Sequence, residues 1–265
     1  MKNCYASLNG LNMYYEIHGN GKPLVLLHGA LSAIEIDFGK IIPLFAKNRK
    51  VIAIEQQAHG HTADIDRPLI YDQMVDDTIA LLRYLNIEKA DIFGYSLGAG
   101  IAMQIAIQHP ELVNRLVLAS VSYNRKGFHH EVIEGVVDLK PEYLDGSPFK
   151  EVYDRIAPNP EDWTTLIEKV NLLNKEIIDL SPETIHMIKA PTLVIIGDSD
   201  IIRPEHAVEI FRLLGGGVPG DITGLPNSQL AVLPGTTHIT LIGRVDWLFS
   251  MISEFLDVNN SKNQK

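Results

Sequence analysis

Ser96 stands between two glycines at a position where its hydroxyl could act as a nucleophile. It is the centre of the Gly-Tyr-Ser-Leu-Gly pentapeptide at 94–98, which follows the run 91–93 and precedes the apolar run 101–107. The first run is typical of a buried strand and the second of a buried helix, so the serine falls at the turn between them. Such a turn strains its central residue and directs the side chain away from the sheet. These surroundings favour a nucleophile over a serine that merely closes a glycine turn.

A serine hydroxyl needs a base that takes its proton and a carboxylate that orients this base. Asp200 and His238 each follow a segment that is expected to be a strand, which gives the order serine, acid, histidine. The chain has ten histidines, but only His238 combines this order with a position after the last expected strand. Asp198 competes with Asp200 for the role of the acid, because two carboxylates so close in sequence look alike.

Strands and helices, which must position these side chains, are expected to alternate along most of the chain. Residues 5–8 and 11–18 flank Asn9-Gly10, a dipeptide that predicts a two-residue hairpin. Apolar runs predict further strands at 23–27, 51–54, 91–95, 116–119, 191–196 and 230–233, and periodicity predicts helices at 38–46, 71–85, 204–214 and 245–256, besides the helix that starts at 97. Strands that alternate with helices predict a mostly parallel α/β sheet, whose carboxyl edge collects the loops with the three side chains.

The segment 122–189 interrupts this alternation, because it contains no strong strand run. Short helices are expected at 131–139, 148–156 and 160–173, and we interpret the segment as an inserted helical cap. The core then comprises 1–121 and 190–258, and the polar tail 259–265 is expected to be disordered. The glycine-rich stretch 215–229 predicts a long loop, whose role the sequence leaves open.

Composition narrows the class of protein. The 265 residues are 46% hydrophobic and carry a net charge of −10, which argues against nucleic acid as a partner. No apolar run is long enough to span a bilayer, the N-terminus lacks a signal-peptide pattern, and the single cysteine excludes an intrachain disulfide. We expect a cytoplasmic protein with a small-molecule substrate, without membrane association or cofactor, and of open oligomeric state. His59-Gly60-His61 is a poor metal motif, so no metal site is predicted.

With these motifs in place, the chain resembles the α/β-hydrolase fold superfamily over nearly its whole length, in the serine-nucleophile, capped, esterase-like branch. The resemblance is carried by His28-Gly29, the pentapeptide at 94–98, Gly-Asp-Ser-Asp at 197–200 and Gly-Thr-Thr-His at 235–238. It implies an eight-stranded, mostly parallel sheet with helices on both faces and a cap after the sixth strand. It also implies that Asp200, rather than Asp198, is the acid.

Acyl transfer further requires N–H donors for the oxyanion. We expect these from the backbone of Leu97 and from the loop after His28-Gly29, at Ala30 or Leu31. His28 is interpreted as a residue that shapes this loop. The substrate pocket is expected to include six apolar and aromatic residues, which could equally form the packing core of the cap: Leu31, Tyr95, Tyr123, Phe128, Trp163 and Met187.

The predicted activity is that of a serine hydrolase that cleaves a small carboxylic ester or related acyl compound through an acyl-enzyme on Ser96. Serine at this position disfavours the dehalogenase and epoxide-hydrolase branches of the fold. Three alternatives stay open: hydrolysis of a carbon–carbon bond in a diketone-like substrate, a perhydrolase or haloperoxidase side activity, and a ligand-binding receptor on the same fold. Against the first, the residues after His238 lack the tryptophan-containing pattern typical of such enzymes.

Overall fold

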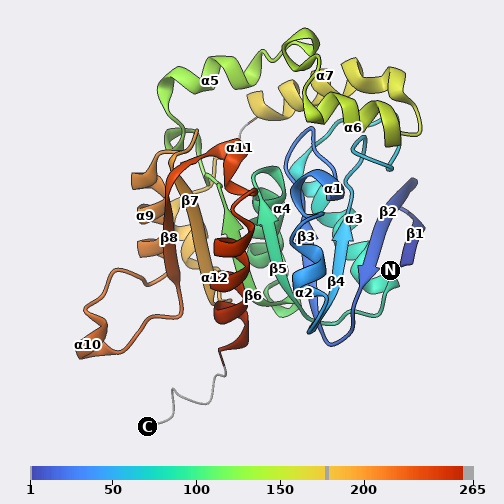
Figure 1. Cartoon of the computed structure of the whole chain (residues 1–265). Helices are drawn as coiled ribbons and strands as arrows, with labels where there is room; N and C mark the ends of the chain where they lie inside the picture. Colours follow the sequence, from blue (N-terminus) through green and yellow to red (C-terminus); the bar gives the residue numbers. More distant parts are fainter. Residues whose placement is uncertain (1, 177–178, 259–265) are drawn as a thin grey trace.

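A computed structural model of the chain describes residues 2–176 and 179–258. An eight-stranded sheet crosses the molecule in the order β1-β2-β4-β3-β5-β6-β7-β8 (Figure 1). Its strands are β1 Lys2–Leu8, β2 Leu11–His18, β3 Lys22–Leu27, β4 Arg49–Ile54, β5 Ala90–Tyr95, β6 Val113–Ala119, β7 Thr192–Ser199 and β8 Gln229–Thr237. β2 pairs antiparallel with β1 and with β4, and all other neighbours are parallel. The predicted sheet is confirmed.

The opening hairpin turns at Asn9 and Gly10, as their sequence predicts. Both residues have positive φ angles, 51° and 81°, which the favoured two-residue hairpin turn requires. Leu8 and Leu11 pair directly across the turn.

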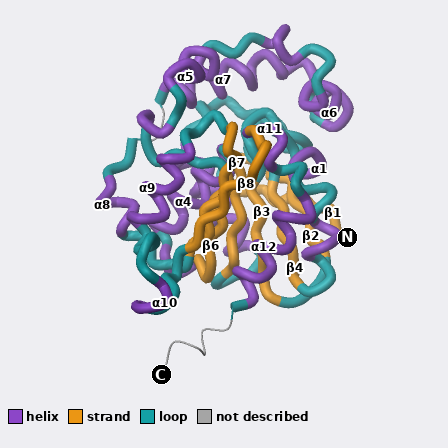
Figure 2. The backbone as a smooth tube through the Cα atoms, turned by 60° about the vertical axis from the view of Figure 1, so that its left-hand side comes forward, coloured by secondary structure: helices purple, strands orange, loops and turns teal. Residues whose placement is uncertain are grey.

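Helices cover both faces of the sheet, and the strands lie between them in Figure 2. The longer ones are α3 Tyr71–Tyr84, α4 Leu97–Gln108, α9 Pro204–Leu213 and α12 Val245–Asp257, and α1 Ile34–Asp37 and α2 Ile42–Phe45 are short. Two further short helices are α10 Gly220–Thr223, which projects away from the sheet at the lower left of Figure 1, and α11 His238–Leu241. The single-turn 3₁₀ helices are η1 Pro110–Leu112, η2 Arg125–Gly127, η3 Pro141–Leu144 and η4 Pro160–Asp162.

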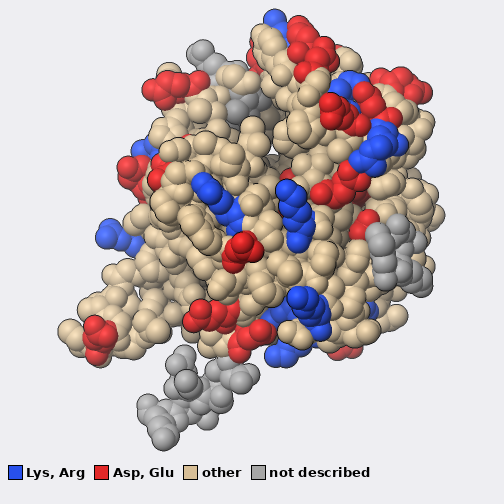
Figure 3. Space-filling view, in the orientation of Figure 1, with Lys and Arg blue, Asp and Glu red and all other residues tan. Residues whose placement is uncertain are grey.

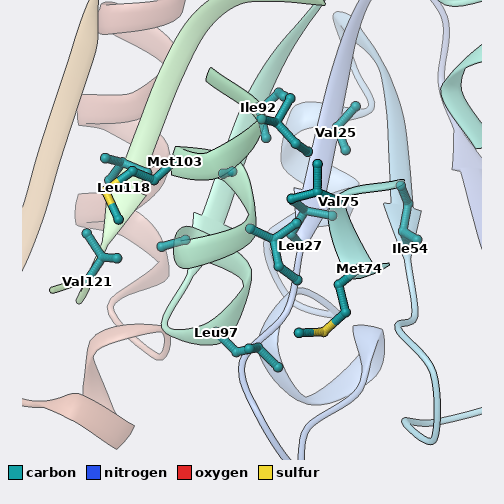
Figure 4. Packing of buried hydrophobic residues seen from close by; sticks show 14 of the residues in the cluster. Val25, Leu27, Ile54, Met74, Val75, Ile92, Leu97, Met103, Leu118 and Val121 are labelled. Atoms are coloured by element: carbon teal, nitrogen blue, oxygen red, sulfur yellow. The ribbon is translucent and has the colours of Figure 1, made fainter. Parts of the chain in front are cut away.

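The core consists of two apolar clusters on opposite faces of the sheet. Along β3, Val25 and Leu27 contribute to the cluster beneath α3 and α4, whereas Leu24 and Leu26 contribute to the cluster beneath α1, α2 and α12. This alternation follows from the two-residue period of a strand, and it explains why a strand buried on both faces is apolar throughout. Figure 4 shows part of the first cluster, to which Leu97 of α4 and Met74 of α3 both belong.

Two predicted element boundaries were wrong. Within the expected helix at 38–46 only the short helix α2 forms, with Pro43 in its first turn, and α1 ends at Asp37, before this range. Proline suits a first turn because it lacks an N–H, and the same lack prevents a helix from continuing through it. The last strand does not end at 233 before a loop: β8 continues to Thr237, and His238 begins α11.

The segment between β6 and β7 forms helices α5 His130–Val137, α6 Pro148–Ile156, α7 Trp163–Lys175 and α8 Pro182–His186. Helices α5, α6 and α7 lie over one end of the sheet at the top of Figure 1. The Lys169 ammonium ties α7 to the loop after β4, since it lies 2.6 Å from the Asp64 carboxylate and donates to two backbone carbonyls there. The division into core and cap at 122 and 189 remains an interpretation.

Acidic and basic side chains are interspersed over the face of the molecule shown in Figure 3.

Within the described ranges, no helix has both the length and the apolar character needed to cross a bilayer.

Candidate active site

Ser96 lies at the junction of β5 and α4 in strained backbone geometry. Its φ and ψ angles are 53° and −117°, a conformation that residues with a side chain rarely adopt. The strand turns into the helix so sharply that a Cβ on Gly94 would lie 2.3 Å from the carbonyl oxygen of Gly98, and one on Gly98 would lie 2.0 Å from that of Leu27. Glycine is therefore required at both positions around the serine.

Ser96, His238 and Asp200, which are far apart in sequence, form one chain of hydrogen bonds. The Ser96 hydroxyl lies 2.9 Å from Nε2 of His238, and Nδ1 of this imidazole lies 2.8 Å from Oδ1 of Asp200. A carboxylate only accepts hydrogen bonds, so Nδ1 carries the proton and Nε2 is left to accept the serine hydroxyl. This tautomer is the one in which a histidine can serve as a base toward the serine.

The Asp200 carboxylate is buried, and its hydrogen bonds keep it ionised. Burial raises its pKa, but the hydrogen bond and charge of His238, the hydroxyl of Ser120 and the N–H of Ile202 outweigh burial and lower the pKa below its usual value. Ser120 was missed by the sequence reasoning. It directly follows β6 at the same edge of the sheet, and that position was the available signal.

Asp198 has a different environment from Asp200. It is exposed at the end of β7 and accepts hydrogen bonds from the backbone N–H groups of Gly235 and Thr236, at 2.9 and 3.1 Å. These bonds lower the pKa of its carboxyl group. Asp198 thus holds the end of β8, whereas Asp200 contacts the histidine.

The loop after β3 is held from below by two buried polar residues. Asp37 accepts a hydrogen bond from the Gly29 N–H and another from the Ser32 hydroxyl, both at 2.8 Å, and burial raises its pKa to about 6. His28 donates from Nδ1 to the Gly29 carbonyl and accepts at Nε2 from the Gln56 N–H. Burial lowers the pKa of His28 to about 3, so this imidazole is neutral and shapes the loop.

Ala30 and Leu97, the predicted oxyanion donors, both line the cavity in front of Ser96. Leu97 is the first residue of α4, where N–H groups have no acceptor within the helix and the helix dipole is positive. Leu31 has a φ of 59°, which gives the loop a sharp turn beside Ala30. Both predicted donor positions thus lie along the same cavity as Ser96.

The cavity encloses about 360 Å³ between the sheet edge and the cap helices. Three of the six predicted pocket residues line it, namely Leu31, Tyr95 and Phe128. Most of the remaining residues that line the cavity are apolar, and the larger of them are Val121, Leu139, Leu144, Phe149, Val170, Leu173, Ile201, Ile202 and Ile239. Among the lining residues that the structure describes, there is no Lys, Arg, Asp or Glu.

The other three predicted pocket residues do not line this cavity. The Tyr123 ring stacks on His206 with 4.6 Å between ring centroids, and its hydroxyl donates to Glu209. The Trp163 ring is buried against Tyr153 within the cap, and Met187 is 56% exposed after α8. The two aromatic side chains therefore serve packing outside the cavity, and the methionine lies at the surface.

The two histidines at 59 and 61 serve the loop after β4. His59 is buried and hydrogen-bonds through Nδ1 to the Gln57 carbonyl, and His61 pairs with the buried Glu55 at 3.0 Å. Within residues 2–176 and 179–258, no group of three or more potential ligands is arranged to hold a metal ion.

Comparison with known proteins finds a family model described as the alpha/beta hydrolase fold, which matches residues 22–151. The uncharacterised hydrolase YugF of Bacillus subtilis is 28% identical, over 94% of this chain and 96% of its own. A 2-hydroxy-6-oxo-6-(2'-aminophenyl)hexa-2,4-dienoic acid hydrolase of Metapseudomonas resinovorans is 26% identical over 79% of each chain.

A solved structure with a similar fold is that of a serine hydrolase involved in carbazole degradation. It superimposes with a TM-score of 0.78, at 23% identity, and covers 97% of this chain and 99% of its own.

Proposed function

Because the chain belongs to the α/β-hydrolase fold superfamily and is a serine hydrolase of that fold, we propose that it hydrolyses a small, uncharged carboxylic ester through an acyl-enzyme on Ser96. The observation that carries the proposal is the hydrogen-bonded chain Ser96–His238–Asp200, which opens on an apolar cavity without charged lining residues among those described.

The proposed reaction begins when Nε2 of His238 takes the hydroxyl proton and Ser96 attacks the ester carbonyl. Asp200 stabilises the imidazolium, and the N–H groups of Leu97 and Ala30 donate to the oxyanion. His238 then gives the proton to the leaving alcohol. A water molecule, deprotonated by the same imidazole, releases the acid from Ser96 and restores the enzyme.

The neutral lining favours an ester over the carbon–carbon bond of a ring-cleavage product. The relative from Metapseudomonas resinovorans is named for a dienoic acid, which is ionised at neutral pH. A carboxylate without a cationic partner in an apolar cavity loses much of its solvation free energy. An uncharged acyl chain, by contrast, gains free energy as it leaves water.

The test compares p-nitrophenyl butyrate with p-nitrophenyl hemisuccinate, whose acyl group ends in a carboxylate. We expect multiple turnover of the butyrate, with kcat/KM about 100-fold above that of the hemisuccinate. Ser96→Ala should lower kcat roughly 10⁴-fold and abolish fluorophosphonate labelling. Ser250→Ala, on the exposed side of α12, is the control and should keep wild-type activity.

Other outcomes identify the alternatives. Preferential hydrolysis of a 6-oxo-dienoic acid would contradict the ester proposal in favour of carbon–carbon cleavage. A single turnover followed by tight retention of the ligand would instead indicate a receptor.

A further inference from the structure

Six hydroxyl groups belong to described residues that line the cavity, and they differ in what they bind. They are those of Ser32, Tyr71, Tyr95, Ser96, Ser120 and Ser122. A hydroxyl has a single proton to donate, so a hydroxyl that already donates to the protein cannot donate to a substrate without breaking that bond.

Five of these protons are committed within the protein. Ser32 donates to Asp37, Ser120 to Asp200 and Ser122 to the carbonyl of Asn124. The Tyr95 hydroxyl donates to the carbonyl oxygen of His238 at 2.8 Å, and that of Ser96 to the His238 imidazole. Asn174, which also lines the cavity, has an interaction of its own in the protein.

The Tyr71 hydroxyl is the exception. It has no hydrogen-bond partner among the described residues. Its oxygen is not sealed off, so water or a ligand in the cavity can reach it. An unpartnered phenol in an apolar wall costs free energy unless water or a ligand satisfies it, so tyrosines in such places usually have a partner. Burial also raises the pKa of this phenol, which keeps the hydroxyl protonated and able to donate.

Tyr71 packs against Gly100 in α4, the helix that follows the reacting serine. A Cβ on Gly100 would lie 2.6 Å from Cε1 of the Tyr71 ring and 3.1 Å from its hydroxyl oxygen, so glycine leaves the room that the ring occupies. The N–H of Gly100 donates to the carbonyl of Ser96, one turn away. The phenol therefore stands beside the first turn of the helix that carries the nucleophile.

We propose that Tyr71 is a specificity-determining residue, whose hydroxyl donates a hydrogen bond to a neutral oxygen atom of the substrate outside the ester group. The occupant is an acyl chain that carries an ether, keto or hydroxyl oxygen, because Tyr71 offers a proton to the cavity while the other described lining hydroxyls donate within the protein. The inference rests on the proposed ester hydrolysis and deepens it from small esters to oxygen-bearing esters.

The test uses pairs of p-nitrophenyl esters of equal length, in which an ether oxygen replaces one methylene at different positions along the acyl chain. Methoxyacetate is paired with butyrate, and 3-methoxypropanoate with pentanoate. We expect Tyr71→Phe to lower kcat/KM about tenfold for at least one oxygen-bearing ester, mainly through KM, and less than twofold for its hydrocarbon partner. Tyr84→Phe, at the exposed end of α3, should change neither.

A second readout needs no turnover. Titration calorimetry on Ser96→Ala, with and without Tyr71→Phe, should show about tenfold weaker binding of the same oxygen-bearing ester when the hydroxyl is absent. Equal losses for both members of every pair, or no loss for any ester in either readout, would overturn the role of Tyr71. Turnover of butyrate by the wild type decides the proposed function separately from either result.

Discussion

Ser120 shows how one hydroxyl adjusts the chemistry of its neighbours. It follows β6 with a φ of 56° and donates to the Asp200 carboxylate, whose other oxygen faces His238. A buried carboxylate that accepts several hydrogen bonds stays ionised at lower pH than one that lacks them. Asp200 must be ionised to stabilise the imidazolium, so Ser120 supports the proposed base through the acid behind it.

Ser120→Ala should therefore raise the pKa of the Asp200 carboxyl group. The carboxylate stays ionised at neutral pH in this variant, but it loses a donor that holds it in place against His238, so we expect kcat to fall about tenfold. Steady-state kinetics with p-nitrophenyl butyrate at neutral pH measure the change. Ser199→Ala, at a neighbouring exposed serine, should keep wild-type kcat, and an unchanged kcat in Ser120→Ala would contradict this role.

At the scale of elements, the ends of β7 and β8 determine where acid and base meet. The pairing of these strands shifts register between Gly197 and Ser199, and Ser199 pairs with Thr237 just before His238. Asp198 fastens the same corner through the backbone of β8. The two carboxylates of the Gly-Asp-Ser-Asp motif thus have separate roles, one in positioning the strand and one in contact with the imidazole.

Asp198→Asn and Asp200→Asn should consequently differ strongly in activity. We expect kcat to fall less than about tenfold for Asp198→Asn, because a looser β8 only misplaces His238. It should fall roughly 10³–10⁴-fold for Asp200→Asn, because the imidazole loses the partner that sets its tautomer. Steady-state kinetics on folded variants measure the difference. The reverse order would show that the assignment of the acid is wrong.

At the scale of the molecule, buried imidazoles link stability to pH. His28 and His59 are fully buried with ring centroids 5.1 Å apart, and burial lowers their pKa values to about 3 and about 4. The unfolded chain binds protons at both positions below about pH 6.5, while the folded chain does not. The contribution of these two neutral imidazoles to the free energy of unfolding is therefore complete above about pH 6.5, and it decreases as the pH falls toward 4. The raised pKa of Asp37 opposes this decrease between about pH 4 and 6.

Each such histidine contributes a slope of about 1.4 kcal/mol per pH unit within this range. His59→Asn keeps an amide N–H for the Gln57 carbonyl but cannot titrate, so the free energy of unfolding should depend less steeply on pH by about this amount between pH 4.5 and 6. Urea denaturation at several pH values measures the slope. His186→Asn, at an exposed histidine, is the control, and an unchanged slope in His59→Asn would refute the linkage.

The sequence by itself determined the fold and the residues proposed for the chemistry. Apolar runs, helical periodicity, Asn9-Gly10 and the glycines around Ser96 act through neighbours a few positions away, so they can be interpreted without the path of the chain. The order of strands then predicts that Ser96, Asp200 and His238 share one edge of the sheet.

Only the tertiary structure decided the contacts between segments that are distant in sequence. Ser120 contacts an acid 80 positions away, and Tyr71 reaches the cavity because Gly100 leaves room for its ring. Tyr123 and Trp163 were expected in the pocket on their residue type, yet their side chains pack elsewhere. The physical reason is that a side chain's direction in the cap depends on how helices pack against one another, and local periodicity does not encode this arrangement.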